Sequence, residues 1–214
     1  MKGIYNSRPR TISLYPKWDV STVLSTIKSW GPNDKLDLKL LTYKTCFLLA
    51  VVCAKRPSTL SMLSVDPTVF QLSDGIVRML PVGIEKHSRP EFIQTPIVIR
   101  KFDDILLDPV GIMKVYLDKT KHNRVDNSLF LSPNPPYPKA SPQMISKFVS
   151  SVISLSGQTG TGGSTRSVAV STAFNKGVSL DKIMEAGDWT RVSTFKTFYY
   201  KPQLPLSNAI LNTS

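Results

Sequence analysis

Three short segments in the last third of the chain carry side chains that suit chemistry on a phosphodiester. They hold Arg166, Trp189 and Tyr199, in that order, on what the sequence predicts to be consecutive short helices. The planar fork of donors on arginine can grip a phosphate, and the indole N–H of tryptophan can donate to a phosphate oxygen. Tyrosine can attack phosphorus and hold DNA covalently. A general acid/base histidine would complete the set, but the position where it is wanted is Gly163.

Two basic residues upstream extend this set, although each has an ordinary alternative. Arg56 follows an apolar run and precedes Pro57, so it either caps the carbonyls of a helix or reaches a phosphate. Lys86 lies between two expected strands, where it is either a solvated turn residue or the donor of a proton to a leaving oxygen. Trp189 and Tyr199 likewise suit plain packing. The order of the five residues is more informative than any one of them.

Composition favours a polyanionic partner. The chain of 214 residues has 27 Lys and Arg against 15 Asp and Glu, a formal net charge of +12. Excess positive charge of this size is typical of nucleic-acid binding. The length suits one domain with a sizeable core. No apolar stretch reaches the about 20 residues of a membrane span and the N-terminus has no signal-peptide core, so no membrane partner is expected.

The two cysteines are expected to be structural. Cys46 and Cys53 stand about two helical turns apart in one apolar run. Buried thiols in a reducing compartment are therefore favoured over a disulfide. With His87 and His122 as the only histidines, no Cys/His zinc site can be assembled.

A glycine-rich segment, 157–164, is a near miss for a nucleotide-binding P-loop. The motif needs a lysine where Gly163 stands, and a helix rather than a strand is expected before the segment. A flexible loop that leads into a helix is the preferred interpretation. No small-molecule substrate is therefore predicted.

The elements that must position these residues are mostly helices. Helix-start signals stand at Asp19, Asp108-Pro109 and Ser141-Pro142, and stop signals at Gly31-Pro32 and Gly177. A change of period predicts a hairpin, 69–72 and 76–80 around a turn at 73–75, and a third strand at 96–99. Three helices are expected to begin after Asp19, at Pro57 and after Asp108. Five others are expected to cover 35–54, 142–157, 164–176, 180–186 and 192–200. The fold class is α+β, mostly helical with one small antiparallel sheet.

These residues and their surroundings resemble the catalytic domain of tyrosine recombinases (phage integrase family), and most of all the recombinases of DIRS-type retrotransposons. The resemblance covers about residues 18–202 and divides the chain into an arm or linker stub (1–17), a catalytic domain (18–202) and a C-terminal tail (203–214). Residues 1–17 are too short to supply the N-terminal DNA-clamping domain of the family. The motifs that carry the resemblance are Arg56-Pro57-Ser58-Thr59-Leu60, Lys86-His87-Ser88-Arg89-Pro90, Ser164-Thr165-Arg166-Ser167, Gly177-Val178-Ser179-Leu180-Asp181-Lys182-Ile183, Gly187-Asp188-Trp189, Ser193-Thr194-Phe195 and Phe198-Tyr199-Tyr200-Lys201-Pro202.

The resemblance implies a role for each site residue. Arg56 and Arg166 would clamp the scissile phosphate, and Lys86 would protonate the leaving 5′ oxygen. Trp189 would donate to the phosphate, and Tyr199 would be the nucleophile that forms a 3′-phosphotyrosine link. Such enzymes recombine double-stranded DNA at specific sites without metal or cofactor, self-associate on DNA and, for retrotransposons, act in the nucleus.

Three departures from the family pattern qualify this interpretation. Gly163 takes the position of a histidine whose loss would lower the rate by about 10²–10⁴-fold, so a catalytically impaired DNA-binding relic is the alternative function. Thr59 takes a position that is often acidic. Tyr199 lies one position later than the usual tyrosine, which would be Phe198, so either a one-residue adjustment occurs or Tyr200 serves. Tyr199 is preferred, because Phe-Tyr before Lys-Pro matches the pattern of these elements better.

Overall fold

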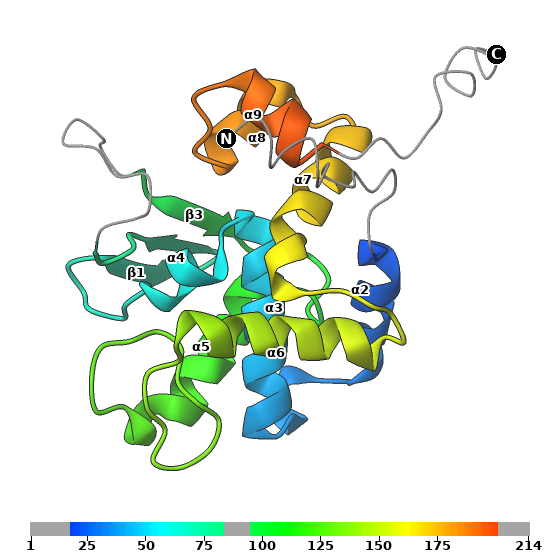
Figure 1. The fold of residues 1–214 in the computed structure, drawn as a ribbon. Coiled ribbons are helices and arrows are strands. Elements are labelled where there is room, and N and C mark those ends of the chain that lie inside the picture. The colour runs from blue at the N-terminus through cyan, green and yellow to red at the C-terminus, as the bar shows by residue number, and fades with distance from the viewer. Residues whose placement is uncertain (1–17, 84–94, 201–214) are drawn as a thin grey trace, which may run out of the picture.

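The computed structural model describes residues 18–83 and 95–200 (Figure 1). It is mostly helical with a small antiparallel sheet, which confirms the predicted fold class. The predicted arm (1–17), tail (203–214) and hairpin lysine, Lys86, lie outside the described residues. In chain order the elements are α2 (Val20–Ser29), η1 (Asn33–Lys35), α3 (Leu38–Cys53), α4 (Pro57–Ser61), β1 (Phe70–Ser73), β2 (Ile76–Met79), β3 (Ile97–Arg100), α5 (Pro109–Thr120), η2 (Lys121–Asn123), α6 (Pro142–Leu155), η3 (Gly162–Ser164), α7 (Thr165–Asn175), α8 (Leu180–Ala186) and α9 (Val192–Phe198).

Side-chain caps fix where several helices begin. The carboxylate of Asp19 accepts from the backbone N–H of Thr22 at the start of α2, and Asp108 caps α5 in the same way. Ser141 accepts from the third residue of α6, as predicted. α3 begins at Leu38, three residues later than position 35, because Asp37 caps it and η1 occupies 33–35.

The sheet has the order β1-β2-β3, and both pairings are antiparallel. Gly75 takes a positive φ of 80° in the turn between β1 and β2, a conformation that glycine adopts readily. In β2 and β3, Val77 and Ile99 face each other across the ladder and are buried, whereas their neighbours Arg78 and Val98 are exposed. The predicted hairpin and third strand are therefore confirmed.

Most of the buried apolar side chains form a central core around α3. This helix packs chiefly against α5 and α6, and both cysteines are buried in it as free thiols, as predicted. One charged side chain also lies in the central core: Lys44 is 0% exposed, and its Nζ has no hydrogen-bond partner among the described residues. Burial lowers the pKa of Lys44 to about 8, although the nearby Asp104 carboxylate acts in the opposite direction.

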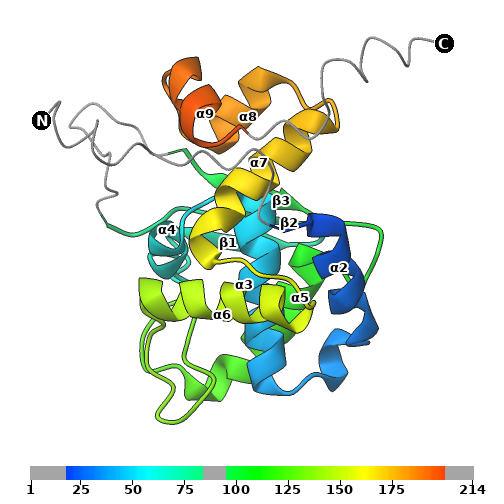
Figure 2. The ribbon, with the colours of Figure 1, turned by 45° about the vertical axis from the view of Figure 1, so that its right-hand side comes forward.

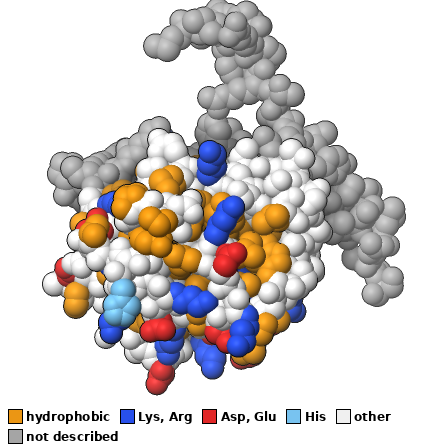
Figure 3. All heavy atoms as spheres, turned by 90° about the horizontal axis from the view of Figure 1, so that it is seen from below, with side chains coloured by type: hydrophobic (Ala, Val, Ile, Leu, Met, Phe, Trp, Pro, Cys, Tyr) orange, Lys and Arg blue, Asp and Glu red, His pale blue; other side chains and the backbone are white. Residues whose placement is uncertain are grey.

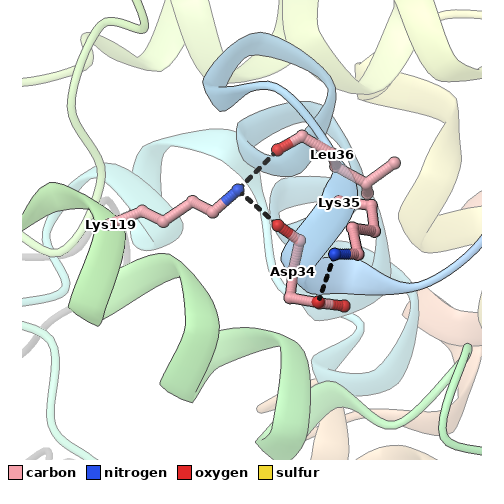
Figure 4. Close-up of polar contacts among 4 residues, drawn as sticks. All are labelled: Asp34, Lys35, Leu36 and Lys119. Atoms are coloured by element: carbon pink, nitrogen blue, oxygen red, sulfur yellow. Dashed lines mark hydrogen bonds and ion pairs between the residues drawn. The ribbon is translucent and has the colours of Figure 1, made fainter.

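A lysine on α5 connects this helix to the segment before α3. The Nζ of Lys119 donates to the backbone carbonyls of Asp34 and Leu36, at 2.8 and 2.7 Å (Figure 4). These carbonyls belong to the turn around η1, which leads into α3. Lys119 therefore holds the backbone of the segment that leads into α3.

The glycine-rich segment 157–164 packs against the start of α2. The indole Nε1 of Trp18 donates to Ser164 Oγ at 3.0 Å, and Gln158 exchanges two hydrogen bonds with the backbone of Asp19. A Cβ at Gly160 would lie 2.4 Å from Trp18 Cδ1, so this close approach requires glycine. A helix, α6, precedes the segment, as predicted, and the loop is an anchor for Trp18.

The last described helices, α8 and α9, form a second, smaller layer, and α7 extends from the central core to reach it (Figures 1 and 2). Val168 still packs in the central core, whereas Val170 belongs to the second cluster. We call this cluster the C-terminal cluster; its buried members are Ala54, Val170, Ile183 and Phe195, with Ala173, Phe174, Leu180, Met184, Trp189, Tyr199 and Tyr200 packed against them.

The face opposite α8 and α9 carries mixed charge. Figure 3 shows Lys and Arg side chains interspersed with acidic and apolar ones on that face. The excess of positive charge is therefore not segregated there into a single basic surface. Within residues 18–83 and 95–200, no helix combines the length and the apolar character that crossing a membrane requires.

Candidate active site

Arg56 leaves the end of the central helix and reaches into the C-terminal cluster. Ala54 ends α3 in the left-handed region with φ 49°, which turns the chain, and Pro57 starts α4 directly after Arg56. The Nη2 atom of Arg56 donates to the hydroxyl oxygen of Tyr199 at 3.2 Å. This contact fits the interpretation of Arg56 as a site residue better than that of a helix cap.

Arg166 lies in the first turn of α7 and is buried, with 5% of its surface exposed. Its Nη2 donates to the backbone carbonyl of Gly187. Its guanidinium carbon lies 4.4 Å from the ring centroid of Trp189 and 5.2 Å from that of Tyr199. Aromatic faces attract a cation at this range. Arg166 is therefore held between the Gly187 turn and two rings.

Trp189 and Tyr199 pack directly on each other, with ring centroids 4.5 Å apart. The indole Nε1 of Trp189 is buried, and within the described part of the chain it has no hydrogen-bond partner. Buried donors are nearly always satisfied. The packing interpretation of Trp189 is therefore confirmed, and its buried N–H is an unsatisfied donor within the described residues.

The two adjacent tyrosines have different surroundings. The ring of Tyr200 packs against Phe174 and Phe195, with centroids 5.1 and 5.9 Å away. Tyr199 instead contacts both arginines and Trp189. Its own carbonyl accepts from Ser171 Oγ of α7 at 2.8 Å, which fixes the backbone directly after α9. Of the two tyrosines, Tyr199 is therefore the one that contacts the other predicted site residues.

The one-residue shift of the tyrosine has a local explanation. α9 ends at Phe198, and the backbone N–H groups of Tyr199 and Tyr200 both donate to the carbonyl of Phe195. Tyr199 has left regular helical geometry, with φ −120° and ψ −34°. The chain therefore turns after Phe198 in a way that presents Tyr199 to the arginines.

Two departures from the family pattern have clear structural settings. Gly163 lies in the middle of η3, three residues before Arg166, and is exposed. A Cβ there would meet only Thr161 Oγ1, at 3.8 Å, which is an ordinary contact. Thr59, at the position that is often acidic, is buried in α4 with 4% exposure. Gly163 therefore leaves room for a side chain, whereas Thr59 is part of the packing.

The sequence interpretation missed an ion pair beside the site. The Nζ of Lys55 donates to Asp188 Oδ2, and the two side chains are 9% and 19% exposed. These residues are 133 positions apart, so no local pattern relates them. The available signal was their position: each stands next to a predicted site residue, Arg56 or Trp189.

A thiol near the site is not a competing nucleophile. Burial raises the pKa of Cys53 to about 12, although the charge of Lys55 acts in the opposite direction. A protonated, buried thiol is inert. Among the described residues, no group of three or more His, Cys, Asp or Glu side chains is placed to hold a metal ion.

No protein-family profile and no curated protein sequence matches the chain at a significant level. Solved structures do match. XerA recombinase aligns with a TM-score of 0.63 and 14% identity, over 96% of this chain and 65% of that one. XerH site-specific recombinase bound to its palindromic difH substrate aligns with a TM-score of 0.69 and 13% identity, over 95% and 53%. A lambda integrase dimer bound to a COC′ core site aligns with a TM-score of 0.55 and 12% identity, over 96% and 54%.

The chain therefore spans about half to two thirds of the length of these proteins. At such low identity the similarity shows the fold, which is that of a tyrosine recombinase catalytic domain. It agrees with the fold class that the residues predicted.

Proposed function

We propose that this protein cleaves and rejoins DNA strands through a covalent bond to Tyr199. The proposal is carried by one observation: Arg56, Arg166 and Trp189 all contact Tyr199, the first at its hydroxyl and the other two at its ring. Arg56 donates to Tyr199, and Arg166 stacks on the rings of Trp189 and Tyr199. Two arginines and a tyrosine in one place suit attack on a phosphodiester better than any other reaction considered above.

Each residue has a defined task in this reaction. The Tyr199 oxygen forms a bond to phosphorus as the bond from phosphorus to the 5′ oxygen breaks, which leaves a 3′-phosphotyrosine. The guanidinium groups of Arg56 and Arg166 donate to the non-bridging oxygens, where charge builds up. The buried N–H of Trp189 gains the partner that it lacks among the described residues.

Proton transfer is the incomplete part of the reaction. The phenolic proton passes to water, since Gly163 has no side chain to accept it. Lys86, outside the described residues, gives a proton to the leaving 5′ oxygen by analogy with the family. Rejoining reverses these steps, and because the phosphotyrosine stores the bond energy, the reaction needs no metal or cofactor.

Double-stranded DNA is the proposed substrate. The net charge of +12 supports a polyanionic partner. The matching XerH structure contains difH substrate, and a matching lambda integrase structure is a tetramer bound to a Holliday junction. By extension we propose that this protein also self-associates on DNA and recombines specific sites. Its closer likeness to DIRS-type retrotransposon recombinases, and the nuclear location that this implies, belong to the same proposal and rest on the motifs alone.

A second function, DNA binding without cleavage, is favoured by one specific observation. Gly163 removes the proton-transfer group without disturbing the arginines that would bind a phosphate. Such a relic would bind DNA with a steep dependence on salt concentration but form no covalent product.

Trapping the covalent intermediate separates the two functions. The protein is incubated with labelled duplex DNA that is nicked next to the cleavage position, so that the short leaving strand diffuses away and the adduct accumulates. An adduct that Tyr199→Phe abolishes and Tyr200→Phe retains supports the enzymatic proposal. Salt-sensitive binding without an adduct from any tyrosine supports the relic. Absence of both would overturn the two functions together.

A further inference from the structure

The ion pair between Lys55 and Asp188 has no task in the proposed reaction. Both side chains are largely buried, with 9% and 19% exposure. A buried charge is unfavourable unless it is paired. The two residues connect the end of α3 to the turn between α8 and α9. The pair is therefore well placed to control how the two segments approach each other.

On one side of the pair lies a tight turn. Asp188 takes a positive φ of 51°, a conformation that aspartate adopts more readily than most residues with a Cβ. Its neighbours both contact the same arginine: the carbonyl of Gly187 accepts from Arg166, and the ring of Trp189 lies over its guanidinium. A Cβ at Gly187 would lie 2.2 Å from Trp189 Cε3, so the turn folds tightly back on the indole.

On the other side lies a second left-handed residue. Ala54, with φ 49°, directly precedes Lys55, and Arg56 directly follows it. Arg56 is the residue that donates to the Tyr199 hydroxyl. Lys55 thus lies between the left-handed Ala54 and Arg56, which contacts Tyr199. Asp188 lies between the tightly folded Gly187 and Trp189, which also contacts Tyr199.

We propose that the Lys55–Asp188 ion pair is a positioning device: it holds two turns, each with a left-handed residue, in the arrangement that brings Arg56 and the Trp189–Arg166 pair to Tyr199. Neither Lys55 nor Asp188 acts on the substrate. The catalytic part of this inference rests on the proposed function, whereas the geometric part concerns the folded protein alone. The two parts are therefore tested by separate measurements.

Conservative variants isolate the ion pair. Asp188→Asn keeps the shape of the side chain, and asparagine tolerates the left-handed region, so only the charge pairing is lost. Lys55→Met keeps the length of the side chain, and Lys55 borders a hollow of about 240 Å³ between α3, β3 and α8, which leaves space for the methyl group. The matched control is Lys114→Met, which removes the exposed ion pair with Asp74.

The first measurement reads the position of Trp189 without DNA. The chain has three tryptophans, so a ¹⁵N–¹H spectrum shows three indole signals, and Trp189→Phe identifies the relevant one. Asp188→Asn and Lys55→Met should each shift or broaden the Trp189 signal and leave those of Trp18 and Trp30 in place. If the Trp189 signal moves no more than in Lys114→Met, the proposal is overturned.

The second measurement reads catalysis with the nicked substrate at saturating DNA. Each single variant should form adduct at least about tenfold more slowly at unchanged DNA affinity, and the double variant should be no slower than the slower single variant, because both remove one interaction. Additive effects or a change in affinity alone would contradict a positioning role. If the wild-type protein forms no adduct, the proposed function fails, while the indole signals still decide the geometric part.

Discussion

The central core packs apolar side chains around α3, whereas the C-terminal cluster packs aromatic rings beside a buried arginine. The charged groups differ in the same way. Lys44 in the central core has no hydrogen-bond partner among the described residues, while Arg166 and Lys55 at the C-terminal cluster are each held by a carbonyl or a carboxylate. The difference separates stability from proposed chemistry: one region holds the domain together, and the other arranges the groups that we propose to bind a phosphate.

The strongest test of this division replaces the buried arginine of the C-terminal cluster. Arg166→Lys keeps the charge but loses the planar fork that can donate twice to a phosphate. We expect the rate of adduct formation at saturating DNA to fall about 10²–10³-fold. The same assay on Lys176→Met, which alters an exposed residue at the end of α7, supplies the control. A rate for Arg166→Lys close to the wild-type value would remove Arg166 from the site.

The reciprocal test weakens the central core. Leu49→Ala removes a fully buried side chain of α3 and should lower the free energy of unfolding by about 2–5 kcal/mol. Chemical denaturation measures this change. At temperatures where the variant is folded, the adduct rate per folded molecule should equal that of the wild type. A large loss of rate in fully folded protein would show that the two regions are not independent.

Adding a side chain at Gly163 tests whether the missing histidine limits the proposed reaction. The position is exposed and takes an ordinary contact at Cβ, so the fold should tolerate Gly163→His. If the missing histidine limits the reaction, adduct formation should rise about 10²-fold. Gly163→Ala, which adds the Cβ without the imidazole, should leave the rate unchanged. An equal rate for the histidine and alanine variants would reject the lost-histidine explanation.

The smallest expected effect concerns the buried lysine of the central core. Burial lowers the pKa of Lys44 to about 8, so below that pH the folded state holds an unfavourable charge. Lys44→Met should therefore raise the free energy of unfolding by about 2 kcal/mol at pH 7. Lys147→Met, on the exposed face of α6, should change it by less than about 0.5 kcal/mol.

The stabilisation that Lys44→Met provides should depend on pH. Between about pH 8 and the ordinary lysine pKa near 10.4, the folded state has released the proton of Lys44 while the unfolded state still binds one. The wild type therefore gains stability with rising pH relative to Lys44→Met, and the advantage of the variant should fade over this interval. A constant difference from pH 7 to pH 10.5 would contradict a buried, titrating Lys44.

Local signals in the sequence were enough to predict most of the fold. Caps such as Asp19 and Ser141, and the change of period at 69–80, depend on neighbouring residues, and the structure confirms the elements that they predicted. The apolar run predicts the start of α3 three residues early, because it does not register the cap that Asp37 provides. The burial of Lys44 was not foreseen, since periodicity does not fix the surroundings of one polar residue in an apolar helix.

The candidate site was only partly predictable for a related reason. The sequence order indicates Arg56, Arg166 and Trp189 and prefers Tyr199, but it gives little physical reason to choose Tyr199 over the adjacent Tyr200. Their difference arises from contacts with α7 and with Arg56, which are distant in sequence. The Lys55–Asp188 pair joins residues 133 positions apart and could be found only in the folded chain.

The contact of Trp18 with the glycine-rich segment has a mechanical consequence. Trp18 and Asp19 are bonded to Ser164 and Gln158, and η3 leads directly into the helix that carries Arg166. A force applied to the chain at Trp18 is therefore borne by the loop in front of α7 as well as by α2. Because Trp18 also packs in the central core, pulling on the domain from that end would load the core and the helix that carries Arg166 together.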